Sequence, residues 1–315
     1  MKQHKFERRE NKKQSSWKEG NSAEFRNGIR SSSKGGNSQR FGNRGDVSAK
    51  KALGQHFLID LSVADAISEI LPDKLDAVVE IGPGMGVLTK RLLPRFGNRL
   101  HCIELDKESV SYLSHQEWSK QLDVTGGDFL TFSWREWIGN SNAQAKQKLD
   151  QEESIELAVI GNYPYNISTQ IVFKVLECGL PVSCMAGMFQ KEVAVRLCAG
   201  SGNKDYGITS VLLQAYYDCT YLFDVADSCF NPPPKVTSGV MVAVRKTEVP
   251  KVNYDSLKKV VKMAFGQRRK TLGNALKPLQ GEKNNFKLPG EFSGKRAEQL
   301  SVDDFLQITN LWDSF

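Results

Sequence analysis

Strand-like and helix-like segments alternate along the middle of this 315-residue chain, and this alternation limits the fold more than any other feature. Short apolar runs predict strands at 77–81, 100–105, around 124, at 155–162 and at 182–189. Helical spacing of apolar residues predicts a helix capped by Asp60 and others at 87–93, from about 107, at 168–177 and at 191–197. This order is typical of an α/β protein with a parallel, doubly wound sheet.

The pattern changes after residue 220. Two further strands are predicted at 221–225 and 236–244, separated by Asn231 and three prolines, and such a connector suits a sheet edge. Beyond Lys246 only helical patterns remain, at 257–265, 272–276 and 302–311, while the polar residues 139–153 predict a loop insertion. We therefore expect a disordered basic tail at 1–47, an α/β domain at 48–247 and a small all-helical domain at 248–315.

Positive charge is concentrated in two segments. Residues 1–50 hold 13 Lys/Arg against 5 Asp/Glu, and residues 231–280 hold 11 against 2, although the formal net charge of the whole chain is only +7. Two basic segments beside an acidic body indicate a polyanionic partner, nucleic acid ahead of anionic membrane. The tail has almost no aliphatic residues and is predicted to be disordered, as a weak RNA-binding arm or an inert solvated tail.

Several kinds of site are not indicated. No stretch of about 18 apolar residues predicts a membrane span, and the four histidines show no metal-ligand spacing. Six cysteines without a Cys-x-x-Cys pair are typical of free thiols in a reducing compartment. Acidic residues in the tail argue against a mitochondrial transit peptide. We expect a cytoplasmic protein with no metal and no membrane partner.

The run from Val159 to Asn166 ends a predicted buried strand with an amide, two aromatic residues and a proline. Pro164 stiffens the turn, and ligands of α/β sheets bind at the carboxyl ends of strands. Asn162 offers an acceptor and a donor, and Tyr165 offers a flat face, so the pair suits a planar heterocycle with an exocyclic amine. An Asx-type turn with a packed tyrosine is the structural alternative.

Three successive strand ends carry residues suited to a nucleoside. Gly82, Gly84 and Gly86 form a turn that lets the backbone approach a ligand closely. Glu104 ends the next strand, where an acid can accept both ribose hydroxyls, and Asp128 follows the third strand, where it can accept from an adenine amine. A ligand with little negative charge is implied, so S-adenosylmethionine fits better than NAD.

The motifs together resemble the small-subunit ribosomal RNA adenine dimethyltransferases, from about Lys50 to the C-terminus. The glycine turn is shared by many methyltransferases, whereas the later motifs are more specific. The motifs are Gly54-Gln55-His56-Phe57-Leu58, the Glu80 to Gly86 turn, Asn162-Tyr163-Pro164-Tyr165, Phe189-Gln190-Lys191-Glu192-Val193, Asn231-Pro232-Pro233-Pro234-Lys235-Val236 and Phe265-Gly266-Gln267-Arg268-Arg269-Lys270-Thr271-Leu272.

The resemblance implies a Rossmann-like methyltransferase sheet with a small helical domain. Its substrate would be two adjacent adenines in a hairpin near the 3′ end of 16S rRNA, dimethylated at N6 in the immature 30S particle by a monomer. S-adenosylmethionine would be bound at His56, Leu58, Gly82, Glu104, Asp128 and Asn162. The chain departs from the family at His56, where asparagine is commoner, at Tyr163, where leucine is commoner, and in its longer 139–153 insertion.

We expect Asn162 Oδ1 and the Tyr163 carbonyl to accept the two N6–H bonds of the target adenine. Tyr165 would hold one face of the flipped base and Phe230 the other, although a core role for Phe230 is the alternative. The expected RNA surface comprises Lys235, Lys258, Lys259, Lys262, Arg268, Arg269 and Lys270.

Three other functions are compatible with parts of the sequence. One is a large-subunit rRNA adenine methyltransferase of the antibiotic-resistance type. Another is a non-catalytic ribosome-assembly factor, against which the complete set of Glu104, Asp128 and Asn162 argues. The third is a nucleotide-dependent oxidoreductase, against which the spacing of the glycines argues because Val87 stands where a third fingerprint glycine is expected.

Overall fold

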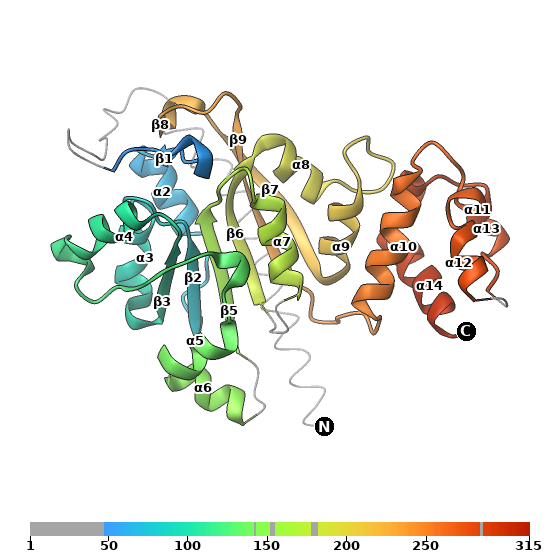
Figure 1. The fold of residues 1–315 in the computed structure, drawn as a ribbon, viewed down its shortest axis with the longest axis horizontal. Helices are drawn as coiled ribbons and strands as arrows, with labels where there is room; N and C mark the ends of the chain where they lie inside the picture. The colour runs from blue at the N-terminus through green and yellow to red at the C-terminus, as the bar shows by residue number, and fades with distance from the viewer. Residues whose placement is uncertain (1–46, 142, 152–154, 178–181, 284–285) are drawn as a thin grey trace.

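A seven-stranded sheet forms the centre of the molecule (Figure 1). The computed structural model describes residues 47–141, 143–151, 155–177, 182–283 and 286–315, so the predicted tail lies outside it except for residue 47. In spatial order the strands are β4 (Asp123–Gly126), β3 (Leu100–Glu104), β2 (Ala77–Ile81), β5 (Leu157–Asn162), β6 (Val182–Gln190), β9 (Ser238–Arg245) and β7 (Tyr217–Val225).

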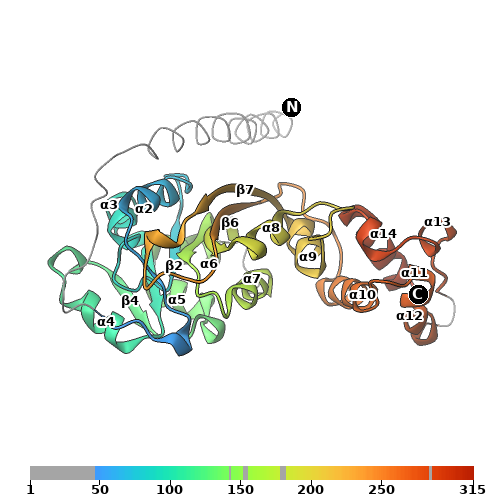
Figure 2. The same ribbon diagram turned by 90° about the horizontal axis from the view of Figure 1, so that it is seen from above.

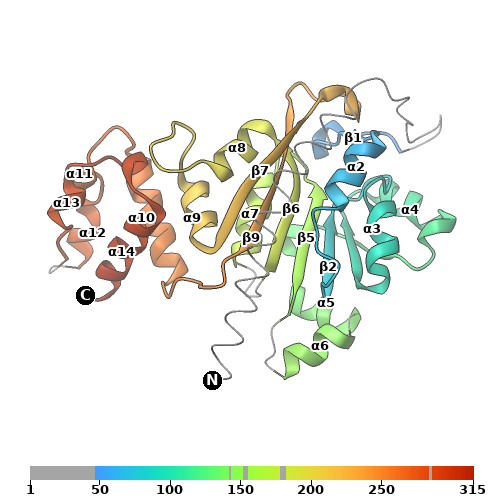
Figure 3. The same cartoon turned by 180° about the vertical axis from the view of Figure 1, so that it is seen from behind.

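The sheet is mixed: the parallel arrangement expected for the first five predicted strands is confirmed, and β9 adds an antiparallel strand whose direction was not predicted. The first five strands in this order are parallel, whereas β9 is antiparallel to both β6 and β7 (Figure 3). Strand β7 returns to β9 through residues 226–237 without a crossover helix. A connection that lacks a crossover helix joins antiparallel strands. In the sheet, β9 lies between β6 and β7.

Helices cover both faces of the sheet because successive buried residues of each parallel strand point to opposite sides. In β2, Val78 packs with the cluster under α2 (Leu61–Ser68) and α3 (Thr89–Phe96), while Val79 packs with the cluster under α7 (Ser168–Glu177) and α8 (Lys191–Cys198). The expected cap of α2 is confirmed, since the Asp60 carboxylate accepts from the N–H groups of Ser62 and Val63 at 2.9 and 3.2 Å.

Residues 139–153 are not the predicted loop. They belong to α5 (Trp134–Ser141) and α6 (Ala143–Asp150) within the described residues, and these helices lie at the amino ends of the strands (Figure 1). Ala145 is fully buried in the core, and Lys148 binds both carboxylate oxygens of Asp76 at 2.8 Å, just before β2. Alanine, glutamine and lysine favour helix, and polarity alone concealed that pattern.

The C-terminal part is helical, as expected. It contains α10 (Tyr254–Gly266), α11 (Leu272–Ala275), α12 (Lys277–Glu282), α13 (Gly290–Ser293) and α14 (Val302–Asp313), and it lies at the β7 end of the molecule (Figure 2). Its core also includes Val211, Leu212 and Ala215 of α9 (Ile208–Tyr216), a helix that was not predicted. The core thus crosses residue 248, and the division of the chain there remains a prediction.

Two short strands close the carboxyl end of the main sheet. β1 (Phe57–Leu58) pairs antiparallel with β8 (Phe230–Asn231), and the N–H of Ile59 donates to the Cys229 carbonyl at 2.8 Å. The segment that precedes α2 is thereby held beside the loop that carries the three prolines. None of the helices described is long and apolar enough to cross a membrane.

Candidate functional site

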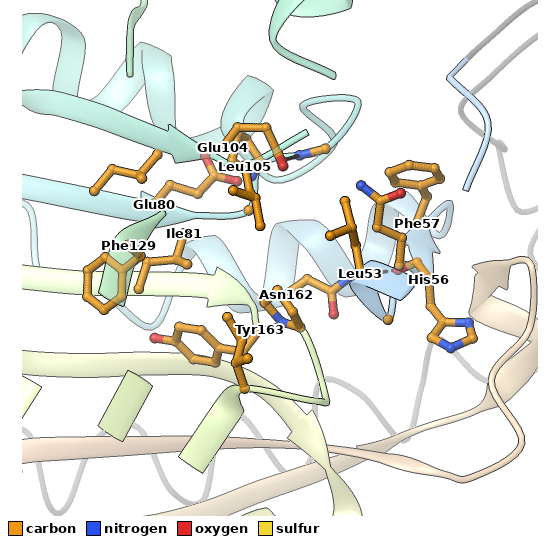
Figure 4. Close-up of a pocket in the computed structure, with 18 of the residues that line it drawn as sticks. Leu53, His56, Phe57, Glu80, Ile81, Glu104, Leu105, Phe129, Asn162 and Tyr163 are labelled. Atoms are coloured by element: carbon orange, nitrogen blue, oxygen red, sulfur yellow. Dashed lines mark hydrogen bonds between the residues drawn. The ribbon is translucent and has the colours of Figure 1, made fainter. Parts of the chain in front are cut away.

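One cavity opens at the carboxyl ends of β2, β3, β4 and β5, with a volume of about 1130 Å3 that includes its open mouth (Figure 4). Parallel strands place their carboxyl ends at the same edge, so residues that are distant in sequence meet there. The cavity brings together these predicted site residues: His56, Leu58, Gly82, Glu104, Asp128, Asn162, Tyr163 and Tyr165. Its lining does not include Phe230, Lys235, Arg268, Arg269 or Lys270.

The turn after β2 requires glycine at two positions. Gly84 and Gly86 have φ values of 56° and 80°, in the left-handed region that favours glycine. A Cβ atom on Gly84 would lie 2.9 Å from the Phe57 ring, and one on Gly86 would lie 2.4 Å from the Trp118 ring. Both positions therefore need glycine for backbone conformation and for space.

Glu104 ends β3 inside the cavity and is 5% exposed. Its two carboxylate oxygens accept from the backbone N–H groups of Asp106 at 2.8 Å and Gly84 at 3.0 Å. Burial raises the pKa of Glu104, and these hydrogen bonds oppose the rise. Each oxygen keeps a lone pair for a further donor, as the recognition of two ribose hydroxyls requires.

The electrostatic character of the cavity favours a ligand without phosphates. Its lining contains the acids Glu80, Glu104 and Asp128 and, among the described residues, no lysine or arginine. Diphosphates are bound by cations or by helix N-termini with a suitable glycine pattern. An uncharged or cationic ligand suits this lining, and a dinucleotide does not.

Apolar side chains that the sequence reasoning did not single out line the cavity beside Glu104 and Asp128. Leu105 directly follows Glu104 and is 51% exposed, which is unusual for a leucine, and Phe129 and Leu130 line the same region. The backbone N–H of Leu130 donates to one carboxylate oxygen of Asp128 at 2.9 Å. An apolar residue next to an acid at a strand end was the available sequence signal.

Asn162 stands at the end of β5 with its side chain oriented by the chain. Its Nδ2 donates to the His56 carbonyl oxygen at 2.9 Å. A carbonyl oxygen can only accept, so the amide must direct its NH2 group to His56. Asn162 Oδ1 is then available to accept a hydrogen bond from a ligand. This geometry supplies the acceptor that the sequence reasoning assigned to Asn162.

The side chain of Tyr163 turns into the core, so only its main-chain atoms are available to the cavity. The ring is 1% exposed, lies 4.6 Å from the Phe189 ring, and its hydroxyl donates to the Ala186 carbonyl at 2.8 Å. Space for the ring comes from Gly187, where a Cβ would lie 2.9 Å from it. A tyrosine therefore replaces an apolar residue without leaving its hydroxyl unsatisfied.

Tyr165 presents an aromatic face held in place at both ends. Its hydroxyl forms a short hydrogen bond with Ser238, and the His56 ring stacks on it with centroids 5.7 Å apart and an interplanar angle of 29°. His56 Nδ1 lies 2.9 Å from the Pro232 carbonyl oxygen, so the ring turns away from Glu104 and towards the proline loop (Figure 4). The imidazole thus lies on the Tyr165 side of the cavity.

Phe230 lies elsewhere than expected. It is 3% exposed, pairs with Leu58 across β1 and β8, and belongs to the hydrophobic core rather than to the cavity. Its ring is unavailable to hold the second face of a base in this conformation. The structure favours the alternative core role, because the strand pairing turns Phe230 inward.

Three side chains of the expected basic surface have partners within the protein. Lys258 and Lys259 form ion pairs with Glu177 and Glu282, and Arg268 donates to the Lys204 carbonyl at 2.7 Å. Lys235, Lys262, Arg269 and Lys270 are exposed. Within the described residues, no cluster of three or more His, Cys, Asp or Glu side chains has a metal-binding arrangement.

Comparison with known proteins adds an independent finding. The sequence profile of the ribosomal RNA adenine dimethylase family matches residues 47–314. A curated relative from Porphyromonas gingivalis, called ribosomal RNA small subunit methyltransferase A, is 49% identical over 276 residues that cover 84% of this chain and 98% of the relative. A relative of the same name from Cytophaga hutchinsonii is 45% identical over 269 residues, covering 84% and 97%.

Solved structures show the same fold. A dimethyladenosine transferase from Plasmodium falciparum has a TM-score of 0.62 at 24% identity, over 80% of this chain and 96% of that one. A 23S rRNA methyltransferase, ErmE, has a TM-score of 0.57 at 21% identity, over 82% and 99%. At these identities the likeness concerns the arrangement of the sheet and helices.

Proposed function

The chain belongs to the ribosomal RNA adenine dimethylase family, and we propose that it dimethylates N6 of two adjacent adenines in a hairpin near the 3′ end of 16S rRNA. The protein is thus a methyltransferase that acts on RNA. The single observation that carries the proposal is the position of Asn162, whose oriented amide lies in the same cavity as Glu104 and Asp128.

The cavity residues fit S-adenosylmethionine as the methyl donor. We expect Glu104 to accept from the ribose hydroxyls, Asp128 to accept from the adenine amine, and Leu105 and Phe129 to cover the adenine ring, since all four line the cavity. The acidic lining suits a ligand that carries a sulfonium and an ammonium group. When bound, this ligand would supply a methyl group attached to a cationic sulfur. After transfer of the methyl group the sulfur becomes a neutral thioether.

The residues of this chain act on the target amine. Asn162 Oδ1 and the Tyr163 carbonyl oxygen accept its two N–H bonds, which favours a pyramidal nitrogen with an available lone pair. Hydrogen bonds fix both acceptors. The Asn162 amide donates to the His56 carbonyl oxygen, and the backbone N–H of Tyr163 donates to the Met188 carbonyl oxygen at 3.1 Å. Positioning and fixed dipoles supply most of the rate acceleration. Each transfer leaves a cationic nitrogen, which loses one N–H proton to water because deprotonation restores its conjugation with the purine ring, so no ionised base is needed.

The Tyr165 face receives the flipped base, and exposed cations outside the cavity bind the RNA backbone. Lys235 lies beside the proline loop, and Arg269 and Lys270 follow α10. Their exposure suits contacts with phosphates, which position RNA without reading its sequence. We place the reaction in the immature 30S particle and expect a monomer that acts in the cytoplasm without a metal.

The proposal is tested with labelled S-adenosylmethionine and small subunits that lack the modification, followed by mapping of methylated bases in both rRNAs. We expect two adjacent dimethylated adenines in 16S rRNA. Asn162→Ala should retain binding of S-adenosylmethionine better than it retains turnover, which should fall on the order of 100-fold. Methylation confined to 23S rRNA would overturn the substrate assignment, and near-normal turnover of the variant would remove Asn162 from the catalytic site.

A further inference from the structure

A ten-residue segment, Lys50–Ile59, crosses from one side of the cavity to the other. At its far end β1 pairs with β8, and His56 Nδ1 meets the Pro232 carbonyl. In its middle the His56 carbonyl accepts from Asn162 Nδ2 at 2.9 Å. The segment therefore touches the catalytic amide and the proline loop.

The near end of the segment is fixed by Asp106, two residues after Glu104. Lys50 Nζ lies 2.5 Å from Asp106 Oδ1, and Gln55 Nε2 donates to Asp106 Oδ2 at 3.3 Å. Gln55 in turn accepts from the backbone N–H of Lys50 at 2.7 Å. These contacts tie both ends of a short stretch to one carboxylate.

The Asp106 carboxylate is buried, unlike that of an ordinary surface ion pair. Its side chain is 1% exposed and also accepts from Ser109 Oγ at 3.0 Å and the Glu108 N–H at 3.3 Å. Burial acts to raise the pKa of Asp106, but the hydrogen bonds from Lys50, Gln55 and Ser109 lower it. Removing Lys50 would leave a buried charge without its cation and would loosen the segment.

We propose that Lys50 and Asp106 are positioning residues for methyl transfer: their ion pair holds the His56 carbonyl against Asn162, so that Oδ1 faces the target amine. The inference rests on the proposed function because it assumes that Asn162 is catalytic. An amide released from the His56 carbonyl can rotate and present NH2 to the amine, which is the wrong partner for an N–H donor. The loss would fall on the chemical step.

The test uses the full-length protein with small subunits that lack the modification. Lys50→Met should lower kcat about tenfold, leave KM for the small subunit and the affinity for S-adenosylmethionine within about twofold, and be largely rescued by Lys50→Arg. Asp106→Asn should lower kcat similarly. Because both variants break one interaction, the double variant should be little worse than either single one.

Lys148→Met is the matched control. It also removes a lysine from a partly buried aspartate, Asp76, but at the amino ends of the strands, away from the cavity. We expect its kcat to match wild type even where its thermal midpoint falls as far as that of Lys50→Met. The control separates a general loss of stability from a loss of positioning.

The inference is overturned if Lys50→Met has the kcat of Lys148→Met, or if it only raises KM for the small subunit, as a phosphate-binding lysine would. Its failure is distinct from failure of the proposed function. An inactive Asn162→Ala beside a normal Lys50→Met would reject only the positioning role, whereas an active Asn162→Ala would reject both.

Discussion

Glu80 is a carboxyl group with 1% exposure inside a cavity that we propose binds a cation. Burial raises the pKa of Glu80 to about 7, a hydrogen bond from the Cys102 thiol opposes the rise, and the charge of Glu104 adds to it. Between pH about 4.5 and 7 the folded protein keeps a proton here that the unfolded chain has released. Glu80 therefore lowers stability as the pH rises through this range.

Replacing Glu80 with glutamine removes this titration. For the protein without cofactor, we expect the free energy of unfolding of wild type to fall relative to Glu80→Gln between pH about 5 and 7, by up to roughly 3 kcal/mol. A cationic ligand favours the ionised form, so S-adenosylmethionine should bind wild type more tightly at pH 8 than at pH 6. Calorimetric titration should show a flatter profile for Glu80→Gln, and equal profiles would contradict the assignment.

Tyr163 allows the roles of a side chain and of its backbone to be separated. In Tyr163→Phe the Ala186 carbonyl loses its hydroxyl donor, so we expect a loss of about 1 kcal/mol in the free energy of unfolding. Methyl transfer should stay near normal, because only the Tyr163 carbonyl is proposed to act. Denaturant unfolding and turnover assays check the two parts, and a large fall in kcat without a fall in stability would show that the hydroxyl matters for catalysis.

At the scale of elements, α6 shows why polarity misleads. A short helix that covers one end of a sheet needs few apolar residues, and among its described side chains Ala145 is the buried one. The contact that fixes the helix, Lys148 to Asp76, joins residues 72 apart in sequence. No local sequence pattern predicts such a pair, so residues 139–153 were expected to form a loop.

A pair of substitutions on α6 tests whether this segment is packed. Ala145→Asp places a carboxylate in the core, and we expect it to reduce the free energy of unfolding by about 2–4 kcal/mol. Gln147→Asp adds the same charge two residues later on the exposed side and should change stability by less than about 1 kcal/mol. Equal small effects in denaturant unfolding would mean that α6 does not cover the core.

The strands β7 and β9 were predicted as strands but not in their direction. Strand propensity is local, whereas direction depends on the connection, and the segment 226–237 was too short for a crossover helix. The same connection contains β8, whose pairing with β1 turns Phe230 into the core. Pairing between residues more than 170 positions apart cannot be predicted from one sequence, so the sequence left open whether Phe230 lies beside the base or in the core.

For the whole molecule, the residues of the candidate site were more predictable from the sequence than the contacts that hold them in position. Glu104, Asp128 and Asn162 were found because parallel strands bring their carboxyl ends to one edge, which is a property of the fold class. Leu105 was missed because its one sequence signal, an apolar residue next to an acid at a strand end, does not show that the leucine is exposed. The contacts of Lys50 with Asp106 and of His56 with Asn162 depend on the course of a segment that crosses the cavity, which only the structure supplies.

The two neighbouring arginines after α10 should differ in what they contribute to the whole molecule. Arg268 donates to the Lys204 carbonyl at 2.7 Å and lies 3.8 Å from Glu298, so it ties the loop before α9 to the C-terminal helices. Arg269 is exposed, and we propose that it meets the RNA backbone. Neutralising a phosphate releases counterions, so each such contact steepens the salt dependence of binding.

Arg269→Ala should therefore weaken RNA binding and reduce the slope of log affinity against log salt by about one unit, with stability unchanged within about 0.5 kcal/mol. Arg268→Ala removes the same charge but should act mainly on stability, by about 1 kcal/mol, with a smaller change of slope because Glu298 already screens that charge. Binding titrations of a small-subunit rRNA hairpin at several salt concentrations, paired with denaturant unfolding, measure both quantities. If Arg268→Ala instead reduces the salt slope more and Arg269→Ala instead loses more stability, then Arg268 contacts the RNA and Arg269 has the structural role.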